Sequence, residues 1–163
     1  MSDRSEPPVS SLKDLYSRPG FMLRRAHQIS TAIFLEETQA LNVTATQYGA
    51  LYVLDHVDNL DQIGLARVLG IDRSTSALVL SKLEGAGWID RRIDPADRRR
   101  RVLLLTEAGR RVLNAVAAPA RQVRERLMAA FTPAEQAQFM ELMAKFVETF
   151  NAQSRTPIAP PQD

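Results

Sequence analysis

The sequence contains no cysteine. Thiol catalysis, cysteine-ligated metals and disulfide bonds are therefore excluded, which fits a reducing cytoplasm. No apolar run approaches the ~20 residues that a membrane-spanning helix needs. The polar segment Met1–Ser11 also lacks the apolar core of a signal peptide. We therefore expect a cytoplasmic chain.

Catalytic residue patterns are also scarce. His27 and His56 are the only histidines, and the sequence has no glycine-rich phosphate loop, no His/acid metal cluster and no nucleophile motif. Glu36 and Glu37 are adjacent and point to different sides of a helix, so they make a poor acid/base pair. We expect no enzyme activity, no cofactor and no metal site.

Positive charge is unevenly distributed, although the net charge is only +2. No Lys or Arg occurs between Arg25 and Arg67, whereas eleven arginines lie from Arg91 to Arg126. Such clustering creates a local positive field. Of the 21 basic residues 18 are arginines, which suit bidentate contacts with phosphate and guanine. A nucleic-acid partner and a merely solvated basic face both remain open.

The 163 residues are enough for one domain with additional arms. Helical spacing of apolar residues predicts helices within 19–43 and 107–151, and residues 44–106 form a separate unit between them. Proline and polar residues in 1–18 and 152–163 predict a flexible arm and a flexible tail. Thr44, Thr106 and Thr132 are expected N-caps.

The unit 44–106 has the order of a winged helix-turn-helix. A short helix, Gln62–Leu69, ends at Gly70, and a second helix begins with Asp72 or Ser74 as its cap. Two β-prone runs then flank the polar insert 94–100, where Asp-Pro indicates a turn. The fold class is therefore mainly α with a small β-hairpin wing.

Polar side chains at two places of this unit are candidates for contacts with duplex DNA. The second helix must carry them into the major groove, and its first turn supplies Arg73, Ser74, Thr75 and Ser76. The hairpin tip supplies Arg98, Arg99, Arg100 and Arg101 for the minor groove or the backbone. Alone, the first group is equally typical of a helix cap and the second of a solubilising turn. Their order and spacing together favour DNA binding.

These residues also carry a resemblance to the MarR family of bacterial transcription regulators. It rests on Leu69–Thr75, on Lys82–Ile89 and above all on Asp94–Arg99, followed by Val102, Leu105-Thr106 and Gly109. The resemblance implies an obligate homodimer with interlocking N- and C-terminal helices. It also implies a pseudo-palindromic operator, release by a small ligand, and a wing ion pair between Asp97 and Arg99.

The last predicted helix supports dimerisation independently. Its apolar band is wide for an element outside the DNA-binding unit, and it needs a partner surface. Packing within one chain is the alternative. The band consists of Phe139, Met140, Leu142, Met143, Phe146, Val147 and Phe150.

A candidate ligand site lies in the first predicted helix. Phe21, Arg24, Arg25 and His27 place aromatic, cationic and imidazole groups within two turns, and Tyr48 and Tyr52 could line the same cavity. The segment is similar to MarR proteins that sense aromatic acids or their coenzyme A thioesters, which implies a repressor of aromatic-compound catabolism genes. The alternative is a core histidine, with the arginines solvated or pairing Glu36 and Glu37 across a dimer.

Two other functions remain open. One is an architectural DNA-binding protein without a small-molecule effector, and the other is a protein-interaction module that uses the apolar last helix. The sequence does not distinguish a repressor from an activator, because that depends on where the operator lies relative to a promoter.

Overall fold

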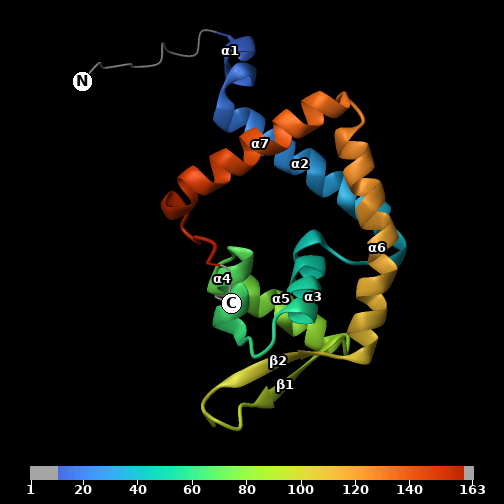
Figure 1. Ribbon diagram of the computed structural model, residues 1–163, viewed down its shortest axis with the longest axis vertical. Coiled ribbons are helices and arrows are strands. Elements are labelled where there is room, and N and C mark those ends of the chain that lie inside the picture. The colour runs from blue at the N-terminus through green and yellow to red at the C-terminus, as the bar shows by residue number, and fades with distance from the viewer. Residues whose placement is uncertain (1–10, 160–163) are drawn as a thin grey trace, which may run out of the picture.

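The computed structural model describes residues 11–159, which are mostly helical, with one short hairpin at the lower edge of the molecule in Figure 1. The order is α1 (Leu12–Ser17), α2 (Pro19–Glu37), α3 (Ala45–His56), α4 (Gln62–Leu69), α5 (Arg73–Gly85), β1 (Ile89–Ile93), β2 (Arg101–Leu105), α6 (Glu107–Met128) and α7 (Pro133–Phe150). Short 3-10 turns, η1 (Gln39–Leu41) and η2 (Asn151–Gln153), follow α2 and α7. Residues 45–105 form a unit, here called the reading head, which α6 connects to α2 and α7 (Figure 1).

Helix starts follow the capping residues in the sequence. The predicted N-caps Thr44, Thr106 and Thr132 are confirmed, and each side chain accepts a hydrogen bond from a backbone N–H three residues on. Asp72, not Ser74, caps α5. Side-chain capping satisfies N–H groups that the first helical turn leaves unpaired, so these residues determine where each helix begins.

The reading head has a complete apolar core. Leu51, Leu65, Leu80 and Leu83 are fully buried, one or two from each of its three helices. The hairpin is antiparallel, with Ile89 opposite Leu105. Its strand β2 joins this core through Leu103, whose N–H donates to the Leu60 carbonyl at 2.8 Å. The predicted winged helix-turn-helix is confirmed.

Gly109 attaches α6 to the base of the hairpin. A Cβ at this position would lie 2.1 Å from the Trp88 carbonyl oxygen, so only glycine lets the helix approach this closely. Thr106 holds the same junction, because its hydroxyl donates to the Gly87 carbonyl at 2.7 Å. The wing therefore keeps a defined position relative to α6.

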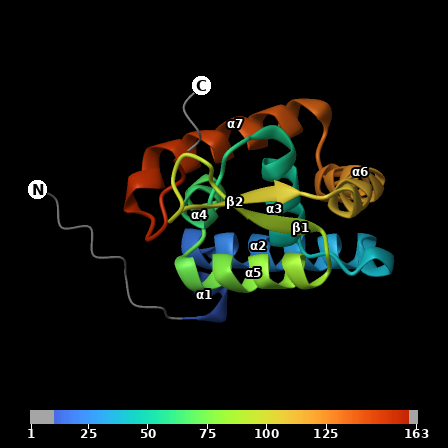
Figure 2. The same ribbon diagram turned by 90° about the horizontal axis from the view of Figure 1, so that it is seen from below.

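The remaining helices have a smaller core. Phe34 of α2 packs with Val116 and Val123 of α6, and Arg126 pairs with Glu36 and Glu37. By contrast, no residue of α7 is buried, and its contacts with other described elements are few: it adjoins η2, and Gln136 at its start donates to the Met128 carbonyl at the end of α6 at 3.1 Å. Figure 2 shows α7 and α2 on opposite sides of α3.

The expectation for the chain ends is corrected in part. Residues 12–17 of the expected arm form α1, because Ser11 accepts the Asp14 N–H and caps the helix. In the expected tail, residues 154–159 are irregular but anchored, since Ala159 N–H donates to the Arg67 carbonyl at 3.1 Å. Residues 1–10 and 160–163 lie outside the described part. None of the described helices is both long and apolar enough to span a bilayer.

Candidate nucleic-acid interface

The first turn of α5 is organised around the carboxylate of Asp72. Its Oδ1 accepts from the Ser74 hydroxyl at 2.5 Å and from the Thr75 N–H at 2.8 Å, and its Oδ2 accepts from the Thr75 hydroxyl at 2.8 Å. These bonds, the one from the Ser74 hydroxyl above all, hold the pKa of Asp72 well below its usual range. Both hydroxyls still have lone pairs that can accept from a base amino group. Arg73 and Ser74 are exposed.

Ser76 does not belong to the exposed surface, contrary to our expectation. It is 1% exposed, its hydroxyl donates to the Arg73 carbonyl at 2.9 Å, and it accepts from Gln62 Nε2 at 3.3 Å. Ser76 therefore joins α5 to α4 and is not placed to contact DNA.

Arg100 anchors the wing from within. Its guanidinium donates to Asp94 at 2.8 Å and to the Asn59 carbonyl, and it lies 3.5 Å from Asp61. The bond with Asp94 is the main cause that raises the pKa of Arg100. We expected this arginine to contact DNA, but its donors are already used to connect the hairpin to the start of α4.

The expected ion pair between Asp97 and Arg99 is also corrected. Asp97 Oδ1 accepts from the backbone N–H of Arg99 at 2.9 Å, and the two side chains form no ion pair within residues 11–159. The carboxylate thus shapes the turn through the backbone and leaves the Arg99 guanidinium exposed.

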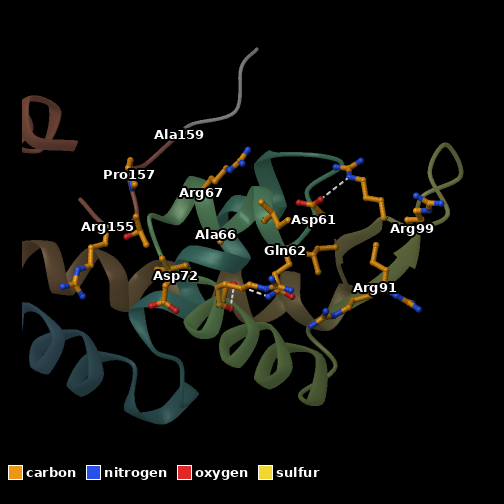
Figure 3. Close-up of a pocket in the computed structure, with 18 residues that line it drawn as sticks. Asp61, Gln62, Ala66, Arg67, Asp72, Arg91, Arg99, Arg155, Pro157 and Ala159 are labelled. Atoms are coloured by element: carbon orange, nitrogen blue, oxygen red, sulfur yellow. Dashed lines mark hydrogen bonds and ion pairs between the residues drawn. The ribbon is translucent and has the colours of Figure 1, made fainter. Parts of the chain in front are cut away.

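A hollow of about 950 Å³ lies between α4, the start of α5, the hairpin and residues 155–159 (Figure 3). We call it the arginine hollow, because seven of its lining residues are arginines: Arg67, Arg73, Arg91, Arg99, Arg100, Arg101 and Arg155. Arg99 and Arg155 lie at opposite ends of it, with Asp72 between them in this view (Figure 3).

Most of these arginines have no acidic partner. Arg91 pairs with Glu84, and Arg100 with Asp94 and Asp61. The other five, Arg67, Arg73, Arg99, Arg101 and Arg155, are exposed and form no ion pair with any described residue. Arg98, at the hairpin tip, is likewise exposed and unpaired among residues 11–159 but does not line the hollow. Like charges held together without counter-charges are typical of a surface that binds a polyanion.

The six candidate ligand residues form two groups. On α2, Arg24 lies over the Phe21 ring at 4.8 Å, and Arg24 and Arg25 both donate to Gln28 Oε1. His27 is exposed, so within one chain it is not the core histidine that the sequence left open as an alternative.

The second group lies on α3. The Tyr48 ring is 6.0 Å from Phe34 and 6.0 Å from Tyr52, which stacks on His56. Burial, with a smaller contribution from Tyr52, raises the pKa of Tyr48. No described hydrogen bond, ion pair or ring contact joins Tyr48 or Tyr52 to the candidate residues on α2. A single chain therefore does not bring the six candidates together around one cavity.

Three residues of the hollow escaped the sequence interpretation. Asp61 directly precedes the predicted short helix Gln62–Leu69, and in the structure it caps α4 and pairs with Arg100. Arg67 is at the end of a short helix, where a basic residue is unremarkable. Arg155 lies in a proline-containing segment, and only the path of the chain after α7 reveals its position. Within the described residues, no group of three His, Asp or Glu is placed to hold a metal ion.

Known proteins resemble this chain along most of its length. The profile of the MarR family matches residues 43–100. The transcriptional regulator HosA of Escherichia coli O127:H6 is 31% identical over 127 residues, which cover 78% of this chain and 93% of HosA. The transcriptional repressor CouR, solved bound to a 23-mer DNA duplex, is 28% identical with a TM-score of 0.78, covering 84% of this chain and 97% of CouR.

A third similar structure concerns the regulation of DNA binding of Bordetella bronchiseptica BpsR by 6-hydroxynicotinic acid. BpsR is 27% identical to this chain with a TM-score of 0.76, and the match covers 80% of this chain and 94% of BpsR.

Proposed function

This chain belongs to the MarR family of DNA-binding transcription regulators, and from that premise we propose that it is a homodimeric repressor that binds a pseudo-palindromic operator. The observation that carries the proposal is the arginine hollow, where five guanidinium groups without an ion-pair partner among the described residues lie beside the exposed first turn of α5. Cations arranged in this way gain the most binding free energy from a ligand whose anions are regularly spaced, and duplex DNA is such a ligand.

We assign the parts of the reading head to different features of DNA. The start of α5, with Arg73, Ser74 and Thr75, enters the major groove, where hydroxyl and guanidinium groups can read base edges. The wing arginines Arg98, Arg99 and Arg101 reach the adjacent minor groove or the backbone. Arg100 keeps the wing in place and contacts no DNA.

The proposed dimer is supported by apolar side chains that one chain leaves uncovered. On α7, Leu142 is 58% exposed, and Phe139, Met140, Phe146, Val147 and Phe150 are exposed as well. On α2, Met22, Leu23 and Ile29 are also exposed. A second copy that covers these helices would present two reading heads related by a two-fold axis, about 34–36 Å apart for successive major grooves.

We further propose that an aromatic acid or its coenzyme A thioester releases the repressor, and that the regulated genes serve aromatic-compound catabolism. Arg24 or Arg25 would pair with the carboxylate or a phosphate, with Phe21, His27, Tyr48 and Tyr52 around the ring. The two groups of candidates come from different helices, so a dimer can unite what one chain leaves apart. The effect of 6-hydroxynicotinic acid on BpsR supports this ligand class.

The test of the effector is a thermal-shift and DNA-release titration with hydroxybenzoates, 6-hydroxynicotinic acid, hydroxycinnamates and their thioesters. A binding acid raises the melting temperature by mass action, and an effector also weakens DNA affinity because it favours the DNA-incompetent state. Arg24→Gln should lose both responses, whereas Arg124→Gln on the exposed side of α6 should keep them. If no compound of the panel changes DNA affinity, the proposed ligand class is wrong.

The test of base reading uses a duplex selected by the wild-type protein from a random-sequence pool. Ser74→Ala should cost roughly 1–3 kcal/mol and relax preference at one base position. Ser76→Ala is the matched control on the same turn. It should lower folding stability and leave sequence preference intact, because the Ser76 hydroxyl is buried against α4. Unchanged preference in Ser74→Ala would contradict the placement of α5.

A further inference from the structure

The chain returns to the reading head after its last helix. Residues 154–159, here called the tail, run from η2 to the end of α4 (Figure 1). The Thr156 hydroxyl donates to the Gly70 carbonyl at 2.7 Å, and Ala159 N–H donates to the Arg67 carbonyl at 3.1 Å. Both contacts join the tail to the turn that separates α4 from α5.

The tail is held in shape from its other end by Asn151. The Asn151 side-chain amide donates to the Ile158 carbonyl at 2.9 Å and accepts the Ile158 N–H at 2.8 Å, so it pairs with both backbone groups of that residue. Ser154 accepts the Thr156 N–H at 3.1 Å. These bonds close the tail into a loop that connects α7 with the reading head.

Gly70 serves the tail as well as the turn. Its φ of +62° ends α4 in the left-handed region. A Cβ there would also lie 2.9 Å from Ile158 Cγ1 and 3.3 Å from the Thr156 carbonyl oxygen. The tail therefore packs directly against the backbone of the turn at Gly70, where there is no side chain.

The docked tail carries Arg155 into the arginine hollow. Arg155 lines it together with Arg67 and Arg73, at the end away from the wing residue Arg99 (Figure 3). It is exposed and forms no ion pair within residues 11–159. Arg155 adds a positive charge next to other unpaired positive charges, which raises their mutual electrostatic repulsion. An anion bound between them would replace this repulsion by attraction.

We propose that the tail is part of the DNA interface and that Arg155 binds a phosphodiester group of the DNA backbone. It flanks the start of α5 on one side, as the wing flanks it on the other. The inference rests on the DNA-binding function proposed above. It adds a sequence-independent contact, because phosphate contacts position a protein on DNA without reading bases.

The experiment measures affinity for the selected duplex and for a scrambled duplex by fluorescence anisotropy over a range of salt concentrations. Each phosphate contact contributes about 0.9 to the slope of log affinity against log salt, so Arg155→Ala should reduce the slope by about 2 in a dimer. The affinity for both duplexes should fall by the same factor, and Arg155→Lys should keep most of the slope.

Arg124→Ala is the matched control, because it removes the same charge from an exposed position on α6 outside the hollow. Its slope should equal that of the wild type. Thr156→Val, which removes the bond to the Gly70 carbonyl, should lose part of the slope while Arg155 is still present.

The outcomes separate this inference from the proposed function. If wild type prefers the selected duplex but Arg155→Ala keeps its slope, the tail contact is wrong and the function stands. If removal of residues 154–163 tightens DNA binding, the tail shields the hollow and the inference is overturned. If wild type binds neither duplex, the function itself fails.

Discussion

The reading head and the helices that surround it differ in how much of each a single chain completes. The reading head buries Leu51, Leu65 and Leu80 fully within one copy. On α7 no side chain is buried, and Phe146 is 44% exposed. A single copy therefore buries the apolar core of the DNA-binding unit completely, but leaves the apolar surface of α7 exposed (below, the finished unit and the unfinished surface).

The same difference applies to charge. At the reading head, unpaired arginines surround one hollow. The Asp72 cap of α5 and the ion pairs of Arg100 in the wing fix the elements that carry them. On α2, Arg24 and Arg25 share Gln28 and stay apart from Tyr48 and Tyr52. The arginine hollow is assembled within one chain, whereas the residues of the proposed effector site lie in two separate groups within one copy.

The largest expected effect concerns the unfinished surface. Phe146→Asp puts a charge into the apolar band of α7, and sedimentation should show a monomer with wild-type helical content. Affinity for the selected duplex should fall on the order of 10³, towards the non-specific level. Gln138→Asp adds the same charge on the polar face of α7 and should remain a dimer. A monomeric wild type, or a dimeric Phe146→Asp variant, would remove the basis of the comparison.

A pair of leucines on α5 tests the finished core. Leu80→Ala should lower the free energy of unfolding by about 2–5 kcal/mol in urea denaturation, since it leaves a cavity at a fully buried site. Leu78 is 59% exposed, so Leu78→Ala should change stability by less than about 0.5 kcal/mol. Equal losses would show that Leu78 is covered by a partner and that the reading head is not complete alone.

Two neighbouring wing arginines should behave differently. Arg99→Ala should keep the urea midpoint but weaken binding to all duplexes, with a salt slope smaller by about 2 per dimer. Arg100→Ala should lower the midpoint, because it leaves Asp94 and Asp61 without their partner. The reverse assignment of effects would show that Arg100, not Arg99, faces the DNA.

The smallest effect is the pH dependence of the α5 cap. The folded-state pKa of Asp72 lies below its unfolded value of about 3.9, so its stabilisation is present above that pH and is lost as the pH falls towards the folded pKa. Wild type should exceed Asp72→Ala in stability at neutral pH, and the difference should shrink under acid. A constant difference down to low pH would mean that the carboxylate charge is not what stabilises this turn.

Much of the fold could be predicted because its signals are local. Thr132, Pro133 and Glu135 lie within four residues and together predict the start of α7. Gly70 likewise ends α4 at the residue that the sequence indicates. Local signals also placed Ser74 at the exposed start of α5. They did not reveal that Ser76, two residues later, points back to Gln62, because that depends on the packing of α4 against α5.

The errors at the candidate site share this cause. The sequence brings Arg98–Arg101 together, but Asp61 and Asn59, some forty residues earlier, take Arg100 out of the exposed set. Arg155 enters the hollow over a still longer separation. Arg24 and His27 on α2 have no hydrogen bond, ion pair or ring contact with Tyr52 on α3 in the described chain, so one copy does not bring these expected ligand residues together.

Sequence-selective DNA binding by the intact protein is the central property of the proposed regulator. The decisive measurement compares wild-type affinity for the selected duplex and for a scrambled duplex of equal length at the same salt concentration. We predict a preference of ~10³ or more, with steep salt dependence for both duplexes. Equal affinity for the two would contradict the account and identify an architectural DNA-binding protein instead.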